Sequence, residues 1–230
     1  MDIEIFYRDR KQRVSELKKS IIHKTSKKCM FRGIDMENDN NRVDVPGSMD
    51  IIMVAAPLGV DRTGFISYLI ENLMVDGPRN VVVLRNDMTG KEFDLVTDCD
   101  VSVENLRGGC VSCSLKSDLI PAIREISSRS GPEIIIFETN HNAQPAVVID
   151  AMMGCTGFDI GEICTIVILD ARLFNNHHRV WEKPLSHQLK EAQLVVIDGV
   201  NDVDDLVTER VMEMVRNMGY EGSISYFPAN

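Results

Sequence analysis

Short apolar runs alternate with amphipathic segments along the chain from residue 50 onwards. The first run, Ile51–Ala55, is continuously apolar, as expected of a strand covered on both faces. The next segment, Thr63–Leu73, has the spacing of a helix. Further strands are predicted at Asn80–Leu84, Glu133–Phe137, Cys164–Leu169, Gln193–Ile197 and Ser223–Phe227, and further helices at Leu115–Ser128, Pro145–Met153 and Val203–Met218.

This alternation predicts an α/β fold, with a doubly wound and mainly parallel sheet joined by right-handed crossovers. Ligands of such sheets bind beyond the carboxyl ends of the strands. The loops that follow the predicted strands should therefore gather at one edge of the sheet. These loops follow Ala55, Leu84, Phe137, Leu169 and Ile197.

Length and composition favour one sizeable domain with an extension. The chain has 230 residues, of which 44% are hydrophobic, and this is enough for a proper core. Residues 33–49 are polar and include Pro46 and Gly47, which is typical of a linker. We therefore expect an extension with a linker over residues 1–49 and an α/β domain over residues 50–230. A short helix is predicted within the extension, at Arg13–Ile22.

Charge is distributed unevenly along the chain, which carries a formal net charge of −10. Residues 1–32 contain ten Lys and Arg against four Asp and Glu, so the remainder is strongly acidic. An acidic domain lacks the basic face that a phosphate backbone requires, so nucleic acid is not the expected main partner. The basic extension packs on the domain as a helix, or it contacts RNA, a membrane surface or an acidic partner.

The chain shows no secretory signal and no apolar run long enough to cross a membrane. Its six cysteines are scattered rather than spaced as a disulfide framework. Both observations favour a cytoplasmic protein without a membrane span.

The loop after the first predicted strand has the position of a phosphate cradle. In the form G-x-x-x-x-G-K-[ST], glycines let backbone N–H groups wrap phosphate, Lys neutralises charge and Ser or Thr binds magnesium. Here Thr63 remains, Gly59 supplies one flexible turn and Gly64 follows, whereas Ala56 and Asp61 replace the two glycines and Arg62 replaces the lysine. The Asp61 carboxylate adds bulk and repulsion, and Arg62 contacts phosphate or simply pairs with Asp61. The residues alone predict a weak nucleotide site.

A Cys-x-x-Cys pair, Cys110 and Cys113, follows a Gly-Gly turn. In a chain of this kind, such a pair indicates a soft metal or a redox couple more than a structural disulfide. The redox interpretation is weaker because the expected flanking aromatic and proline residues are missing. A tetrahedral zinc ion needs four ligands, so Cys99, Glu104 or a histidine must complete the set, from this chain or from a second copy in a homodimer.

Four stretches together resemble the nucleotide-binding domain of the CobW/HypB/UreG family, P-loop GTPases that deliver metals or act in cobalamin-related pathways. The resemblance covers roughly residues 50–228 in the family's order. It implies a P-loop NTPase fold, GTP or ATP with Mg²⁺, zinc or another transition metal, and a client metalloenzyme. The four stretches are residues 56–63, 109–119, 138–145 and 167–174, with Gln188 downstream.

The resemblance also implies roles for individual residues. Thr63 would ligate magnesium, Arg62 would contact the terminal phosphates, and Glu138 would sit at the attacking water as the catalytic residue. Cys110 and Cys113 would hold the metal ion.

Several family positions are altered in this chain. Ser112 replaces the middle cysteine of the metal motif, and His141 replaces the glycine that senses the terminal phosphate. The Asn-Lys-x-Asp element that reads guanine is Asp198–Asn201 here, with Asn201 in place of its carboxylate and Asp202 next to it. The family's C-terminal second domain is expected to be absent, because the chain stops about where the first domain ends.

Two functions follow from this pattern. The first is a nucleotide-dependent metal-handling protein, in which GTP hydrolysis drives release of the metal held by the cysteine pair. The second is a pseudo-GTPase that keeps the fold as a metal-binding or scaffold module. The altered nucleotide elements leave both hydrolysis and guanine preference open.

A few other residues could be assigned a function, but an ordinary structural role explains them equally well. His177 and His178 form an adjacent pair that could bind a late transition metal, but an exposed loop is the default expectation. Cys155 and Cys164 are expected to be buried small hydrophobic residues. Trp181 is expected to fill the core.

Overall fold

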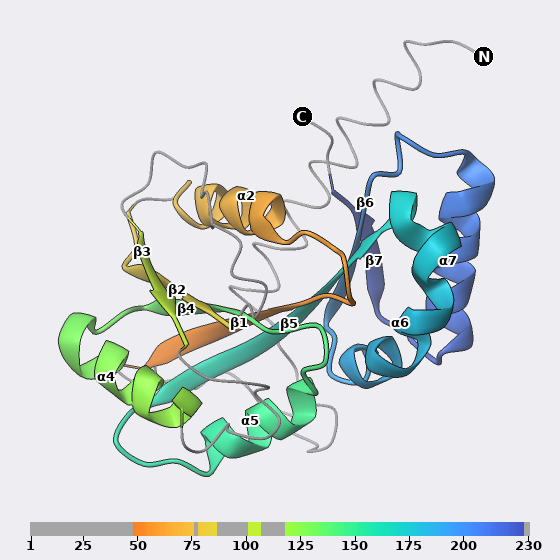
Figure 1. The fold of residues 1–230 in the computed structure, drawn as a ribbon. Coiled ribbons are helices and arrows are strands. Elements are labelled where there is room, and N and C mark those ends of the chain that lie inside the picture. The colour runs from red at the N-terminus through yellow and green to blue at the C-terminus, as the bar shows by residue number, and fades with distance from the viewer. Residues whose placement is uncertain (1–47, 76–77, 87–100, 107–117, 228–230) are drawn as a thin grey trace, which may run out of the picture.

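The computed structural model describes residues 48–75, 78–86, 101–106 and 118–227 (Figure 1). The predicted helix of the N-terminal extension lies outside these ranges, as do Cys99, Cys110 and Cys113. The first strand begins at Met49, within the segment assigned to the linker from its sequence.

The described part of the chain forms a seven-stranded sheet with the order β3-β2-β4-β1-β5-β6-β7. Every pair of neighbouring strands is parallel. The predicted α/β class and doubly wound parallel sheet are therefore confirmed. The strands are β1 Met49–Ala55, β2 Val81–Arg85, β3 Ser102–Asn105, β4 Ile134–Glu138, β5 Ile160–Asp170, β6 Leu194–Asp198 and β7 Ser223–Tyr226.

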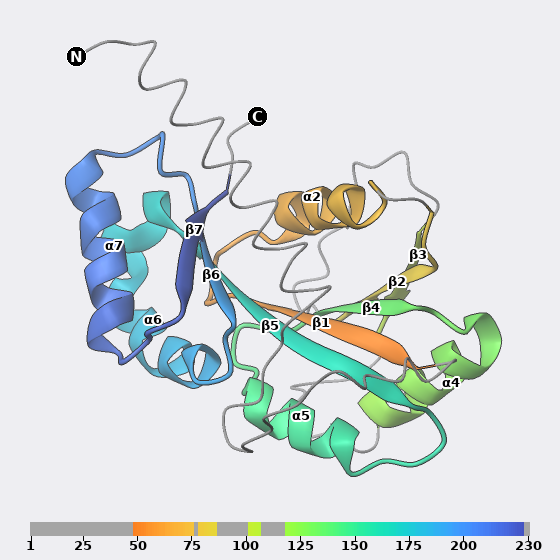
Figure 2. The same ribbon diagram turned by 180° about the vertical axis from the view of Figure 1, so that it is seen from behind.

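Helices cover both faces of this sheet, as Figures 1 and 2 show from opposite sides. One apolar cluster joins the sheet to α2, α6 and α7, and a second joins it to α4 and α5. The helices are α2 Thr63–Leu73, α4 Ile120–Ser130, α5 Pro145–Met153, α6 Phe174–Leu189 and α7 Asp205–Asn217.

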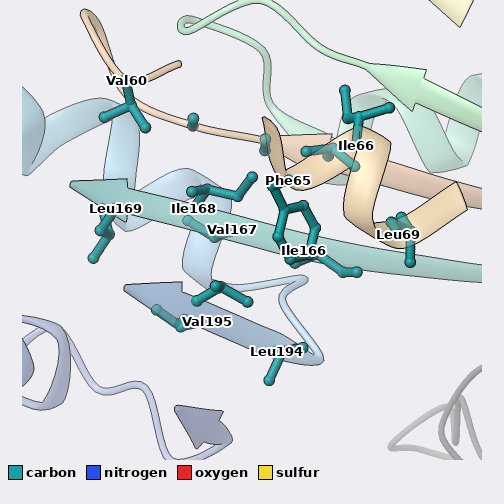
Figure 3. Packing of buried hydrophobic residues seen from close by; sticks show 14 of the residues in the cluster. Val60, Phe65, Ile66, Leu69, Ile166, Val167, Ile168, Leu169, Leu194 and Val195 are labelled. Atoms are coloured by element: carbon teal, nitrogen blue, oxygen red, sulfur yellow. The ribbon is translucent and has the colours of Figure 1, made fainter. Parts of the chain in front are cut away.

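The central strand β1 is continuously apolar from Ile51 to Ala55 because it contributes to both clusters. Ile52 and Val54 belong to the α2 side, whereas Ile51 and Met53 belong to the α4 side, and all four are nearly inaccessible to solvent. This is the alternation of side chains expected of a strand covered on both faces. Figure 3 shows the α2 side, where Phe65 belongs to the same buried cluster as the apolar side chains of β5 and β6.

Among the strands and α-helices, two were not predicted from the sequence. Strand β3 is short, polar and largely exposed at the edge of the sheet, so it lacks an apolar run. Helix α6 contains Pro184 and many polar residues, which obscure its apolar face. The expectation that His177 and His178 lie in an exposed loop is wrong, because both lie in α6.

The buried face of α6 is anchored by Trp181, which has no exposed surface, as predicted. Cys164 is buried as expected, whereas Cys155 is only half-buried. Among the described residues, no helix is long and apolar enough to cross a membrane.

The parallel strands bring the ends of β2, β4, β5 and β6 to one edge of the sheet. The register pairs Arg85 with Glu138 across β2 and β4, and Asp170 with Asp198 across β5 and β6. Each of these four strands thus ends in a charged residue at the edge where the loop after β1 also begins.

Candidate functional site

The loop between β1 and α2 is held in place by its own turn and by α6. Gly59 has a φ of 89°, a conformation in the left-handed region that glycine adopts without strain. The indole Nε1 of Trp181 donates a hydrogen bond of 2.9 Å to the backbone oxygen of Leu58. The predicted cradle is therefore a defined loop that leads directly into α2, with Thr63 as the first residue of that helix.

Asp61 caps the beginning of α2 from outside the helix. Its Oδ1 accepts a hydrogen bond of 3.0 Å from the backbone N–H of Thr63. Partial burial acts to raise the pKa of Asp61, but hydrogen bonds from Thr63 and from the Arg62 backbone, with the Arg62 charge, hold it below the ordinary value. The carboxylate therefore occupies one of the N–H groups that a phosphate would use at a helix N-terminus.

Arg62 pairs with Glu138 rather than with Asp61. The Nε of Arg62 lies 2.9 Å from Oε1 of Glu138, and the Nε of Arg85 lies 2.8 Å from Oε2 of the same carboxylate. All three residues are buried, with exposed fractions of 9% for Arg62, 7% for Arg85 and 3% for Glu138. We call this group the Arg62–Glu138–Arg85 triad. Both oxygens of the predicted catalytic carboxylate thus accept hydrogen bonds from guanidinium groups.

The loop after β4 is tied to the cradle by Gln188 of α6. The side-chain amide of Gln188 donates to the backbone oxygen of His141 at 3.1 Å and to that of Ala56 at 3.4 Å. Gln188 is completely buried, and its Oε1 has no hydrogen-bond partner among the described residues. In the same loop, the amide of Asn140 donates to Oδ1 of Asn86 at 2.7 Å.

A second ion cluster lies at the ends of β5 and β6, where the guanine-reading element was predicted. Arg172 forms a two-pronged pair with Asp170, with Nε and Nη2 at 2.9 and 2.8 Å from the two carboxylate oxygens. The same guanidinium reaches Asp198 at 2.8 Å and Asp202 at 3.2 Å. We call this group the Arg172 cluster. Asn201 is exposed beside it.

The two clusters carry charges of opposite sign. The Arg62–Glu138–Arg85 triad has one positive charge in excess, whereas the Arg172 cluster has three carboxylates around one cation. Burial raises the pKa of Asp198, and the neighbouring charge of Asp170 adds to this effect against the opposing influence of Gly199 and Arg172.

A comparison with known families identifies the domain. The profile of the CobW/HypB/UreG nucleotide-binding domain matches residues 50–224. The chain belongs to the CobW/HypB/UreG family. Members of this family are GTPase-like, metal-handling chaperones, so the resemblance seen in the four sequence stretches is confirmed at the level of the family.

Solved structures share the fold at low sequence identity. The hydrogenase maturation factor HypB from Archaeoglobus fulgidus is 14% identical with a TM-score of 0.52, covering 94% of this chain and 88% of HypB. A Zn(II)-bound triple mutant of the YjiA GTPase is 12% identical with a TM-score of 0.51, covering 80% of this chain and 58% of that chain. Zn(II)-bound YjiA from E. coli is also matched over 58% of its own length. This CobW-family chain thus spans less than two thirds of YjiA.

The described residues of this CobW-family domain do not fit magnesium-bound nucleotide in the arrangement observed. Asp61 occupies the Thr63 N–H, and the triad uses both oxygens of Glu138. Arg172 likewise occupies the carboxylates of the predicted base-reading element. Arg85 was not predicted as a site residue. Its position, an arginine at the end of a buried apolar strand, could have indicated that it lies at the functional edge of the sheet.

Only part of the predicted metal site lies within the described residues. Cys110 and Cys113 lie outside the described residues, so their pairing stays a prediction. Glu104, a suggested further ligand, lies on β3 and forms an ion pair with Arg129 of α4. The described part of the chain contains no group of three His, Cys, Asp or Glu side chains suited to a metal ion.

The triad yields a prediction about stability. We expect Glu138→Gln to lower the free energy of unfolding by about 3 kcal/mol, because it removes the carboxylate that two buried guanidinium groups share. Urea unfolding followed by circular dichroism measures this loss. The matched control is Glu125→Gln, which removes an exposed partner of Arg129 and should change the free energy by less than about 0.5 kcal/mol. Equal effects of the two substitutions would contradict the assignment of a buried ion triad.

Asp61 links stability to pH. A carboxylate whose pKa is lower in the folded state stabilises the fold above its unfolded pKa, and this contribution disappears as the pH falls through the folded pKa. We therefore expect Asp61→Asn to lose less stability than the wild type between about pH 5 and pH 3. Urea midpoints at both pH values test this, with Asp205→Asn in the first turn of α7 as the control. The interpretation fails if Asp61→Asn and the control behave alike.

Proposed function

We propose that this protein binds a transition metal ion through Cys110 and Cys113 and passes it to a client metalloenzyme. In this proposal the P-loop domain acts as a binding module that does not hydrolyse nucleotide. Membership of the CobW/HypB/UreG family supports the metal-handling role. The observation that carries the loss of hydrolysis is the state of Glu138, whose two carboxylate oxygens both accept from buried arginines.

A carboxylate must have an available oxygen to orient or deprotonate an attacking water. Each oxygen of Glu138 has a second acceptor site, but the residue is only 3% exposed and is held by charge-assisted hydrogen bonds, which are stronger than neutral ones. Releasing Arg62 would separate a buried guanidinium from the carboxylate that it is paired with, which is costly in the protein interior. The triad therefore opposes the rearrangement that hydrolysis would require.

The metal-binding role rests on the chemistry of the cysteine pair. Thiolates are preferred ligands of zinc and other late transition metals, and two of them supply half of a tetrahedral set. The remaining ligands come from Cys99, from a histidine or from a second copy of the chain. A Zn(II)-bound triple mutant of YjiA, in which two cysteines are replaced by alanine, has a related fold; its zinc is therefore not an argument for the thiolate ligands proposed for this chain.

The last described residue before the segment that carries the cysteine pair is bonded to the backbone of a triad residue. The backbone N–H of Leu106, just before that segment, donates to the backbone oxygen of Arg85 at 2.8 Å. Arg85 in turn holds Glu138.

A second candidate function is a nucleotide-driven cycle of metal capture and release, with hydrolysis. The defined cradle loop favours it, because Gly59 has the left-handed turn and Thr63 still begins α2. This candidate requires GTP or ATP with Mg²⁺ as cofactor. It differs from the first in predicting phosphate release.

The metal site is tested by Cys110→Ser. We expect zinc affinity to fall by more than about 100-fold, since even residues that only support a ligand contribute 10–100-fold to metal affinity. Competition with a colorimetric zinc chelator measures this. Cys155→Ser, at a half-buried cysteine of known position, serves as the control and should leave the affinity unchanged. Unchanged zinc affinity in Cys110→Ser would end the metal proposal.

Nucleotide chemistry separates the two candidates. We expect no phosphate release from GTP or ATP with Mg²⁺, whether or not zinc is bound, because the triad withholds Glu138 from water. A coupled phosphate assay, together with calorimetric titration before and after zinc loading, provides the measurement. Phosphate release that depends on zinc, with micromolar nucleotide binding, would favour the nucleotide-driven cycle instead.

A further inference from the structure

Helices α6 and α7 lie side by side on one face of the sheet (Figures 1 and 2). Nη1 of Arg210 in α7 donates to Oδ1 of Asn175 in α6 at 3.4 Å, and the same guanidinium lies 5.4 Å from the ring centroid of Phe174. Because α6 joins β5 to β6 and α7 joins the next parallel pair, β6 and β7, both helices run back along the sheet in the same direction. Their outer sides therefore form one surface made of two helices that point the same way.

The outer side of α6 is basic, although the α/β domain as a whole is acidic. Arg179 and Lys183 are exposed on the helix, and Lys190 is exposed directly after it. None of the three forms an ion pair with any other residue that the structure describes. Glu182 is the single carboxylate of this helix, so the three cations outnumber it and can pair with another molecule.

The outer side of α7 carries the opposite charge. Asp205, Glu209 and Glu213 follow one another at intervals of four positions, and all three are exposed. They form no ion pair within the described part of the chain. The two arginines of α7 do not neutralise this row, because Arg210 contacts α6 and Arg216 donates to backbone oxygens that follow the helix. A basic row and an acidic row thus lie next to each other on one face.

Each row includes one large apolar side chain that is well exposed. Val180 of α6 is 57% exposed and Leu206 of α7 is 65% exposed. In both helices a charged residue follows three positions later, Lys183 after Val180 and Glu209 after Leu206. Residues three positions apart are neighbours on a helix surface, so each helix presents an apolar group beside a charge, with the same spacing and opposite sign.

We infer that the α6–α7 face is an interface between two copies of this chain. A two-fold axis parallel to the helices places α6 of each copy against α7 of the other. Val180 then packs on Leu206 of the partner subunit, Lys183 pairs with Glu209 of the partner subunit, and both contacts occur twice. Apolar contacts supply affinity at such an interface, whereas the complementary charges fix the register and exclude wrong arrangements.

A second copy fits this face better than the other candidate occupant, the basic N-terminal extension with its charged residues 1–32. That extension would attract the acidic row of α7 but repel the basic row of α6. A second copy offers both signs in the required order. The inference goes beyond the proposed function, because the interface uses neither the cysteine pair nor the nucleotide loops.

Charge exchange tests the interface in the intact chain. We expect wild type to form a dimer in sedimentation velocity, and the dimer to weaken as NaCl rises from about 0.1 M to about 1 M, because the Debye length falls from about 10 Å to about 3 Å. Lys183→Glu and Glu209→Lys should each weaken the dimer by more than about tenfold, since each places two like-charge pairs in the interface. An equimolar mixture of the two variants should restore it, because the heterodimer carries complementary charges at both contacts.

Arg79→Glu and Glu125→Lys make the same changes of charge outside α6 and α7, and they should leave the dimer unchanged. Wild type that stays monomeric at the lower salt concentration would overturn the inference. So would Lys183→Glu and Glu209→Lys proteins that dimerise as well as wild type, or a mixture that is no more dimeric than either variant alone. The last result is expected if the acidic row binds only the N-terminal extension. Zinc affinity and phosphate release play no part in these outcomes, which are therefore independent of the proposed function.

Discussion

The pairing of Glu138 with two arginines is the interaction on which the functional edge of this domain depends. Arg85 comes from β2, Glu138 from β4 and Arg62 from the loop before α2, so the triad joins two strands to the cradle. Buried charges are tolerated only when each has a partner, and here one carboxylate serves two cations. The triad therefore fixes where the cradle lies relative to the sheet, and it determines what chemistry Glu138 can perform.

Ion pairing between strand ends also occurs at the ends of β5 and β6, on the same edge of the sheet. At both positions that the sequence predicted for nucleotide contacts, the domain's own arginine and carboxylate groups pair with each other. Arg62 pairs with Glu138 near the cradle, and Arg172 pairs with Asp170, Asp198 and Asp202 near the base-reading element. Internal ion pairs thus satisfy the charged groups at both positions.

Much of the fold could be predicted because burial imposes a pattern on the sequence. Helices α2 and α5 have the bounds that the apolar spacing predicts, and strand β1 is recognisable as a buried run. Helix α6 was missed because Pro184 and its polar face hide the helical period. Strand β3 was missed because it is an exposed edge strand. It buries few side chains, so its sequence lacks an apolar run.

The sequence by itself determined the alternation of strands and helices, the family and the identity of the altered motif positions, since these follow from residue type and local spacing. Only the tertiary structure decided which charges meet. Arg62 and Glu138 are separated by 76 positions, and Arg85 and Glu138 by 53. Their pairing depends on strand order and register, which bring distant strand ends to one edge. For that reason the sequence predicted Arg62 as a phosphate ligand, whereas the fold places it against Glu138.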